Sequence, residues 1–310
     1  VRWLPFTLML VPYVLTFLTK VWRWRVLFHP DEARTPFGLL FSTLMISYIP
    51  LPFRLGEVAR GAVASARSGI PAPRVFSTIL VEKVLDVLTL LLLLGISLPF
   101  VPLPRDFDQK PLILLGIGVL IVAIVLVVLV VRPDLARKLI GLVVSRLPVR
   151  FRPRITEGAD HALQGLAPLS NPRVSVQVGL WSMATWMINM VTVYFMLLAF
   201  NLEVTPIVAI VLVVVTNLSM AIPSAPGYVG VFEYSVFLVL TALGQPVASS
   251  QAFAVIYHFV GLVPVAILGV IGALQLGLNF TALRGNDEPK PPTDIRPIMD
   301  DRQTTSISSK

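Results

Sequence analysis

The sequence of 310 residues has no cysteine, only three histidines and only 14% charged residues. Without cysteine, disulfide bridges and thiolate metal sites are excluded. The histidines, at positions 29, 161 and 258, lie in separate segments and do not form a zinc-binding spacing. Gly-rich loops that cradle phosphate and nucleophile elbows are also missing. We therefore predict a protein that is not an enzyme and that uses no metal or cofactor.

What the sequence has in abundance is apolar residues. The hydrophobic fraction is 55% and the mean hydropathy is +0.82. The run 112–131 carries no charge and exceeds the roughly 18 residues that mark a membrane span. Four further long apolar runs cover 3–28, 75–100, 174–200 and 247–278. This pattern predicts an all-α, polytopic membrane helix bundle with about five full spans.

The net charge of +8 could suggest nucleic-acid binding, but its distribution indicates a membrane protein. The basic residues lie between the apolar runs, above all in 132–173, as the positive-inside rule requires. We expect a membrane domain at 1–283 in the cell (cytoplasmic) membrane. The amphipathic segment 132–173 and a disordered tail at 284–310 would be cytoplasmic. The near-neutral loops 105–110 and 201–203 would lie outside.

Two similar stretches, 49–57 and 222–233, interrupt the apolar runs. Each begins with Ile-Pro and has a second Pro, a Gly four residues later and then a Glu. Pro and Gly cannot continue a helix cheaply. In a membrane, a broken backbone is tolerated only where it is buried in protein or lines a watery cavity. The predicted break residues are Pro50, Pro52, Gly56, Pro223, Pro226, Gly227 and Gly230.

The segments around these breaks are predicted to form hairpins. At about 1.5 Å per residue, the run 37–49 reaches only about 20 Å, less than a bilayer core of about 30 Å. We therefore predict re-entrant hairpins at 37–69 and 206–243. Counting the spans brings them in from opposite sides, an inverted-repeat arrangement typical of transporters, with tips that meet inside the bilayer. The alternative is that both stretches are ordinary interfacial loops.

Ionisable side chains inside apolar segments are costly and are functional candidates by default. Glu82 and Asp86 are four residues apart and share one helix face. Arginine suits phosphate because its planar guanidinium donates two hydrogen bonds side by side. The alternative is a structural ion-pair network that holds the hairpins to the run 75–100. His258 is interpreted as a packed polar residue rather than a proton carrier. The candidate site residues are Arg54, Glu57, Arg60, Glu82, Asp86 and Glu233.

Two expectations concern where charges lie. The basic, Trp-rich segment 20–25 suits the headgroup layer at the end of the first span. At least one of Arg54 and Arg60 should reach a carboxylate of Glu82 or Asp86, because a lone charge at that depth is expensive.

The stretches 47–60, 82–86 and 223–233 together resemble the lysylphosphatidylglycerol synthase transmembrane region, also called the flippase-like domain family. The resemblance covers residues 1 to about 280. It implies a role in moving lipids across the inner membrane, and that the six candidate residues are the typical polar positions of the family. The family usually has one more N-terminal span, which we expect this chain to lack. Without a soluble aminoacyl-transferase domain, lysyl-lipid synthesis is not expected.

Together these observations predict a protein that binds and translocates an anionic phospholipid or polyprenyl-phosphate-linked headgroup. Arg54 and Arg60 would contact the phosphate, and the four carboxylates would neutralise them in the empty state. The alternative is a non-transporting scaffold or partner of a separate lipid-modifying or glycosyl-transfer enzyme. Membrane lipids are the expected partners, and nucleic acid is not.

Overall fold

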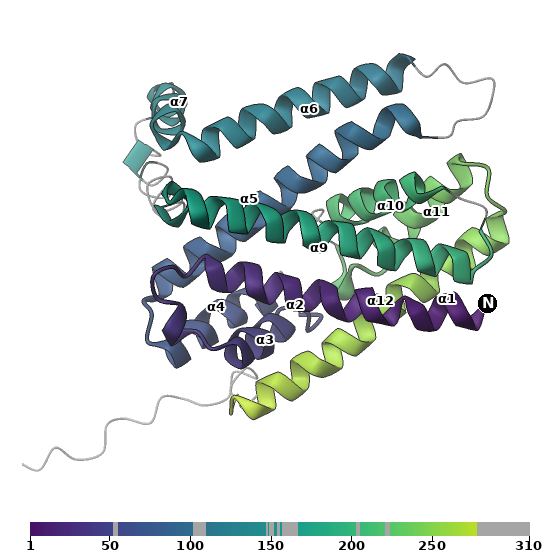
Figure 1. Ribbon diagram of the computed structural model, residues 1–310, viewed down its shortest axis with the longest axis horizontal. Helices are drawn as coiled ribbons and strands as arrows, with labels where there is room; N and C mark the ends of the chain where they lie inside the picture. The colour runs from purple at the N-terminus through teal and green to yellow at the C-terminus, as the bar shows by residue number, and fades with distance from the viewer. Residues whose placement is uncertain are drawn as a thin grey trace, which may run out of the picture. The chain divides into compact units, whose positions relative to one another are not determined.

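The computed structural model describes residues 1–51, 55–101, 110–146, 148, 152–153, 156, 167–202, 205–220 and 224–277. These residues form helices and turns, without a strand among them, so the all-α prediction is confirmed. The helices are α1 (Trp3–Leu8), α2 (Leu10–Val26), η1 (Glu32–Arg34), α3 (Phe37–Ile46), α4 (Leu55–Ser68), α5 (Ala72–Ser97), η3 (Leu98–Phe100), α6 (Lys110–Val131), α7 (Pro133–Ser145), η5 (Ala167–Ser170), α9 (Pro172–Ala199), α10 (Pro206–Ser219), η6 (Pro226–Tyr228), α11 (Val231–Ala242) and α12 (Val247–Gln275) (Figure 1).

Five long helical segments occupy the positions of the five predicted spans. Three of them, Trp3–Val26, Pro172–Ala199 and Val247–Gln275, are long and apolar enough to cross a membrane. The other two are α5, with 26 residues, and α6, with 22 residues. At about 1.5 Å per residue, both exceed the thickness of a bilayer core. The chain is therefore an all-α membrane helix bundle.

The pairing of α2 with α9 defines the two ends of the bundle. The backbone N–H of Arg2 donates to the carbonyl oxygen of Ala199 over 2.6 Å, and the Thr185 hydroxyl donates to Thr19 over 2.9 Å. The two helices are therefore antiparallel. One end of the bundle holds the start of α1 and the end of α9, and the other holds the end of α2 and the start of α9 (Figure 1).

Each predicted hairpin is a pair of short helices separated by a break. Helices α3 and α4 contact each other, as do α10 and α11. Figure 1 shows α3 and α4 toward the end of the bundle where α2 ends, and α10 and α11 toward the opposite end. This is the arrangement that an inverted repeat requires. How deep each hairpin enters a membrane stays a prediction.

The two breaks contact each other. Gly227 has a φ of +73°, a backbone conformation that glycine adopts more easily than other residues. A Cβ atom built on Gly227 would lie 3.6 Å from the Cβ of Pro50 and 3.3 Å from Leu262 of α12. The expectation that the two tips meet is therefore confirmed. Pro52, Arg54 and Pro223 lie outside the described residues.

Helix α12 is packed closely against the first hairpin. A Cβ on Gly269 would lie 2.5 Å from the carbonyl oxygen of Met45, and one on Gly272 would lie 3.0 Å from that of Ser42. Only a residue without a side chain permits this approach, so α12 and α3 contact each other backbone to backbone. Helix α3 is therefore held by α12 as well as by α4.

The apolar core has two parts. The first contains Leu212, Val236 and Phe253 and joins α9, α10, α11 and α12. The second contains Trp24 and Leu44 and joins α2, α3 and α5. Buried charged side chains lie where the two parts adjoin, since they contact Trp186 of the first and Trp24 of the second.

The basic segment 132–173 is described mainly through α7. Leu135, Leu139 and Leu142 of α7 are exposed at helical spacing, with Arg137 and Lys138 on the same helix. Helix α7 is therefore amphipathic, and its contact with anionic headgroups stays a prediction. The first compact unit of the chain ends at Leu276, and the predicted boundary at 283 and the tail lie outside the described residues.

Candidate functional site

The centre of the candidate site is an ion pair between the first hairpin and α5. Nη2 of Arg60 lies 2.7 Å from Oε2 of Glu82, and Nη1 lies 3.5 Å from Oε1. The guanidinium carbon lies 3.6 Å from the ring centroid of Trp24. Arg60 is 1% exposed and Glu82 2%. The predicted pairing of a hairpin arginine with α5 is confirmed for Arg60, whereas Arg54 lies outside the described residues.

Local sequence explains how α4 comes so close to α5. The buried residues of α4 include Gly56, Arg60, Val63 and Ala64, which recur at the spacing of one helix face. On the same helix, a Cβ added to Gly61 would lie 2.5 Å from the Phe76 ring of α5. The small residues of this face therefore bring Arg60 within reach of the carboxylates of α5.

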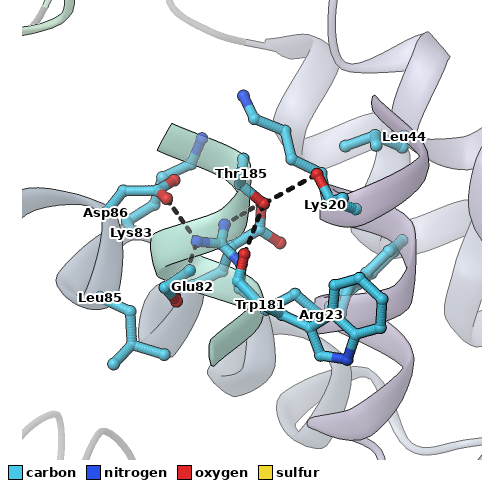
Figure 2. Close-up of polar contacts among 12 residues, drawn as sticks. Lys20, Arg23, Leu44, Glu82, Lys83, Leu85, Asp86, Trp181 and Thr185 are labelled. Carbon is cyan, nitrogen blue, oxygen red and sulfur yellow. Dashed lines mark hydrogen bonds and ion pairs between the residues drawn. The ribbon is translucent and has the colours of Figure 1, made fainter. Parts of the chain in front are cut away.

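A second arginine, Arg23 of α2, completes the cluster. Nη1 of Arg23 lies 2.6 Å from Oδ1 of Asp86, and Nη2 lies 3.4 Å from Oε1 of Glu82. Nη1 also donates to the Ser182 hydroxyl over 3.3 Å. The Arg23 side chain is 0% exposed. Figure 2 shows its guanidinium group between Asp86 and Glu82. We call Arg23, Arg60, Glu82 and Asp86 the charged cluster.

The interpretation of segment 20–25 as a headgroup-layer anchor is therefore wrong for Arg23. It is also wrong for Trp24, which is fully buried and donates its indole N–H to the Thr78 hydroxyl over 3.0 Å. Composition at the end of a span favours the headgroup layer, but helical rotation turns these side chains inward. The sequence did contain a pattern that could have predicted the burial of Arg23. Thr16, Thr19 and Arg23 recur at helical spacing and form one polar, buried stripe.

Asp86 joins the cluster to α9. Its Oδ1 accepts the indole N–H of Trp186 over 3.1 Å in addition to the bond from Arg23. Glu82 is shared by two arginines and Asp86 by an arginine and an indole. The carboxylates that were predicted to share one face of α5 do so, and both contact Arg23.

A partly exposed ion pair lies beside the cluster. Nζ of Lys83 on α5 lies 2.7 Å from Oε1 of Glu57 on α4, and the two side chains are 41% and 26% exposed. Like the Arg60–Glu82 pair, it joins the first hairpin to α5. The structural network considered from the sequence is thus present in the geometry.

Glu233 has different partners from the charged cluster. Its Oε1 lies 2.7 Å from Nδ1 of His258, and its Oε2 accepts the backbone N–H of Gly230 over 2.7 Å. His258 is buried and stacks on Phe232 with ring centroids 4.5 Å apart. Glu233 therefore caps α11 and ties the second break to α12. Glu57 pairs with Lys83 and Glu233 with His258, so the two carboxylates that were expected at the tips have different partners.

Lys20 was not among the predicted site residues. Its ammonium group donates to the Tyr48 hydroxyl over 3.0 Å and lies 5.4 Å from the Trp186 ring centroid. Tyr48 belongs to the turn that follows α3, at the first break. Lys20 thus connects α2, the first break and α9.

The charged cluster keeps hydrogen-bond donors that have no partner. Among the described residues, these are Nε of Arg23 and Nε of Arg60, while Nη2 of Arg23 faces Oε1 of Glu82 at 3.4 Å without forming a hydrogen bond. A buried donor without a partner costs about 1–3 kcal/mol, more on a charged group. The cluster is therefore paired in charge but incompletely hydrogen-bonded. Within the described part of the chain, no group of three or more His, Asp or Glu residues could hold a metal ion.

Long apolar helices around buried ion pairs define a multi-pass membrane protein. Residues 1–269 match the family model described as the lysylphosphatidylglycerol synthase TM region, and the chain belongs to this family. The resemblance of the three motifs to this family is therefore confirmed.

Two curated proteins are similar to the chain. Glycosyltransferase AglD of Haloferax volcanii is 28% identical over 306 residues, which cover 87% of this chain and 49% of that protein. A UPF0104 membrane protein of Methanocaldococcus jannaschii is 22% identical over 222 residues, which cover 71% of this chain and 90% of that protein. The chain thus spans about half the length of the Haloferax protein. No solved structure matches the chain.

Proposed function

We propose that the protein binds the anionic headgroup of a phospholipid or polyprenyl-phosphate-linked lipid and translocates it across the cytoplasmic membrane, without catalysing a reaction. The observation that carries the proposal is that two arginines, Arg23 and Arg60, are buried in a membrane bundle and still hold N–H donors without partners. A network that served stability alone gains nothing from such donors. A phosphate group could accept them.

The chemistry of the cluster fits a phosphate ester. Guanidinium groups donate paired hydrogen bonds to phosphate as they do to carboxylate. In the empty protein, Glu82 and Asp86 neutralise Arg23 and Arg60. An arriving phosphate could first take the unpaired donors and then replace a carboxylate. Each arginine would keep an anionic partner throughout, so no step buries a bare charge.

The positions of the two breaks support translocation of the headgroup. Pro50 and Gly227 lie against each other, and their hairpins lie toward opposite ends of the bundle. Broken helices at membrane depth and inverted repeats are features of transporters. The family to which the chain belongs, a lipid synthase transmembrane region, supports a lipid as the ligand.

The orientation follows from charge. Arg132, Arg137 and Lys138 lie at one end of the bundle, next to the end of α6. The positive-inside rule places this end in the cytoplasm, and with it segment 132–173 and the tail 284–310.

A vesicle assay tests the proposal. The purified full-length chain is reconstituted, and transfer of fluorescent phosphatidylglycerol between leaflets is compared with that in empty vesicles. We expect the parent to accelerate transfer. The double variant Arg60→Met/Glu82→Met should abolish acceleration while remaining folded, because replacing a buried ion pair by apolar residues is often neutral or stabilising. Arg34→Met, an exposed position of η1, is the control and should transfer like the parent. A double variant as active as the parent would refute this role of the cluster.

A second function is favoured by two observations. The chain matches about half of a protein named as a glycosyltransferase, and the Arg60–Glu82 pair is almost completely buried. Both suit a membrane partner of a glycosyl-transfer or lipid-modifying enzyme that moves no lipid itself. A parent protein that transfers no lipid faster than empty vesicles, but crosslinks in native membranes to such an enzyme, would favour this function.

A further inference from the structure

Lys20 is a cation of the bundle without a carboxylate partner in the described part of the chain. Its ammonium group is held by the Tyr48 hydroxyl at 3.0 Å and by the rings of Tyr48 and Trp186, at 5.7 and 5.4 Å from the centroids. No Asp or Glu among the described residues forms an ion pair with it. Arg23 and Arg60, by contrast, both contact Glu82.

The ammonium group of Lys20 lies at mid-length of the bundle, and Lys20 is partly buried. Trp186 is at the middle of α9, which has 28 residues, so it lies about 21 Å from either helix end at about 1.5 Å per residue. Arg23, one turn later on α2, contacts Ser182, which is nearer the start of α9. Figure 2 shows the Lys20 side chain extending away from Arg23. Lysines near helix ends usually extend toward the headgroups, and Lys20 points inward instead.

The surroundings of Lys20 reduce the cost of its charge without cancelling it. Aromatic faces and a hydroxyl attract a cation, but they carry no net negative charge. Asp86 accepts the indole N–H of Trp186 and already pairs with Arg23. A charge at this depth without a counter-ion is expensive. An anion that brings its own charge therefore gains more at Lys20 than at the paired arginines.

We propose that Lys20 and Tyr48 bind the phosphate of the lipid headgroup at mid-depth of the bundle, a proposal that rests on the proposed function. Lys20 supplies the charge and further N–H donors. The Tyr48 hydroxyl accepts from Lys20, and its own proton has no acceptor among the described residues, so it can donate to a phosphate oxygen. Because Tyr48 belongs to the first break, a bound phosphate would connect this break to α2.

The same geometry predicts the class of headgroup. A phosphate diester without a cationic substituent, such as that of phosphatidylglycerol, neutralises Lys20. A headgroup with its own quaternary amine, such as that of phosphatidylcholine, brings a like charge beside the ammonium group. The site should therefore select anionic over zwitterionic lipids.

Lipid retention measures this selection without requiring transport. The full-length chain in detergent is incubated with equal amounts of phosphatidylglycerol and phosphatidylcholine, and bound lipid is counted by native mass spectrometry. We expect Lys20→Met to retain at least about tenfold less phosphatidylglycerol and unchanged phosphatidylcholine. Lys20→Arg should stay within about threefold of the parent. Arg34→Met, an exposed charge on η1, should match the parent.

Each other outcome overturns the proposal. Parental phosphatidylglycerol retention by Lys20→Met, or equal loss of both lipids, would show that Lys20 does not bind the headgroup. A lowered thermal midpoint with unchanged retention would assign Lys20 a structural cation–π role. Displacement of phosphatidylglycerol by inorganic phosphate would show a site for free phosphate rather than for a lipid.

The vesicle assay separates this proposal from the proposed function. If the parent retains phosphatidylglycerol through Lys20 but transfers no lipid, translocation fails and the binding site stands. If Lys20→Met both retains and transfers lipid like the parent, translocation stands and the Lys20 site fails.

Discussion

Pro50 and Gly227 contact each other, although they belong to opposite halves of the chain. A Cβ on Gly227 would lie 3.6 Å from the Cβ of Pro50. Each residue interrupts a pair of short helices, so the ends of four short helices are gathered around one contact. The charged cluster and Lys20 belong to the helices around it. A change at this contact should therefore affect both hairpins.

Gly227→Ala tests how tightly this contact is built. A non-glycine residue at φ of +73° costs about 1–2 kcal/mol, and the new methyl group would also press on Leu262 at 3.3 Å. Gly244→Ala is the matched control, because Gly244 has φ of +77° and nothing within 4 Å of its added Cβ. We expect Gly227→Ala to lower the thermal midpoint in detergent more than Gly244→Ala. Equal decreases in the thermal midpoint for the two variants would show that the contact at Gly227 accommodates the added methyl group without further cost.

Removal of Arg23 should unbalance the charged cluster. Arg23→Met leaves the partly buried Asp86 without its cation and removes one of the two arginines that contact Glu82, which we expect to cost about 3 kcal/mol in the free energy of unfolding. The double variant Arg23→Met/Asp86→Asn should recover most of this loss, since Glu82 keeps Arg60. Unfolding by denaturant in mixed micelles measures both. Arg34→Met should stay within about 0.5 kcal/mol of the parent. A single variant as stable as the parent would show that Arg23 is not a structural partner.

Glu233 and His258 should act as one unit. Glu233→Ala removes the cap of α11 and the partner of a buried imidazole, and we expect a loss of about 1–3 kcal/mol. His258→Phe keeps the stack on Phe232 but removes the other half of the pair. In a double-mutant cycle, the coupling free energy should be about 0.5–3 kcal/mol. Additive effects of the two substitutions would contradict a direct interaction.

Single cysteines test the orientation, because the chain has no other thiol. Lys138→Cys on α7 should react with an impermeant maleimide only after the cells are permeabilised. Thr205→Cys, before α10 at the other end of the bundle, should react in intact cells. The physical reason is the concentration of Lys and Arg near α7. Labelling of Lys138→Cys from outside would reverse the proposed topology.

Much of the fold could be predicted because the bilayer imposes one-dimensional rules. A span needs a long apolar run, and Pro and Gly interrupt helices wherever they occur. The long helices, both breaks and the pairing of Arg60 with Glu82 follow from such rules. The burial of Arg23 could not be predicted from such rules. Its distance from the helix end suited the headgroup layer, but its burial depends on which face of α2 meets α5 and α9.

The sequence by itself determined the class of protein, the positions of the long helices and breaks, and the need of the buried carboxylates of α5 for cations. These features depend on local composition and spacing, and the bilayer constrains both directly. Only the tertiary structure decided which cations those are, that Glu233 belongs to His258, and that Lys20 lies against Trp186 with no carboxylate partner among the residues described. These features depend on helix rotation and on contacts between segments far apart in the chain, which many different sequences of similar hydropathy would arrange differently.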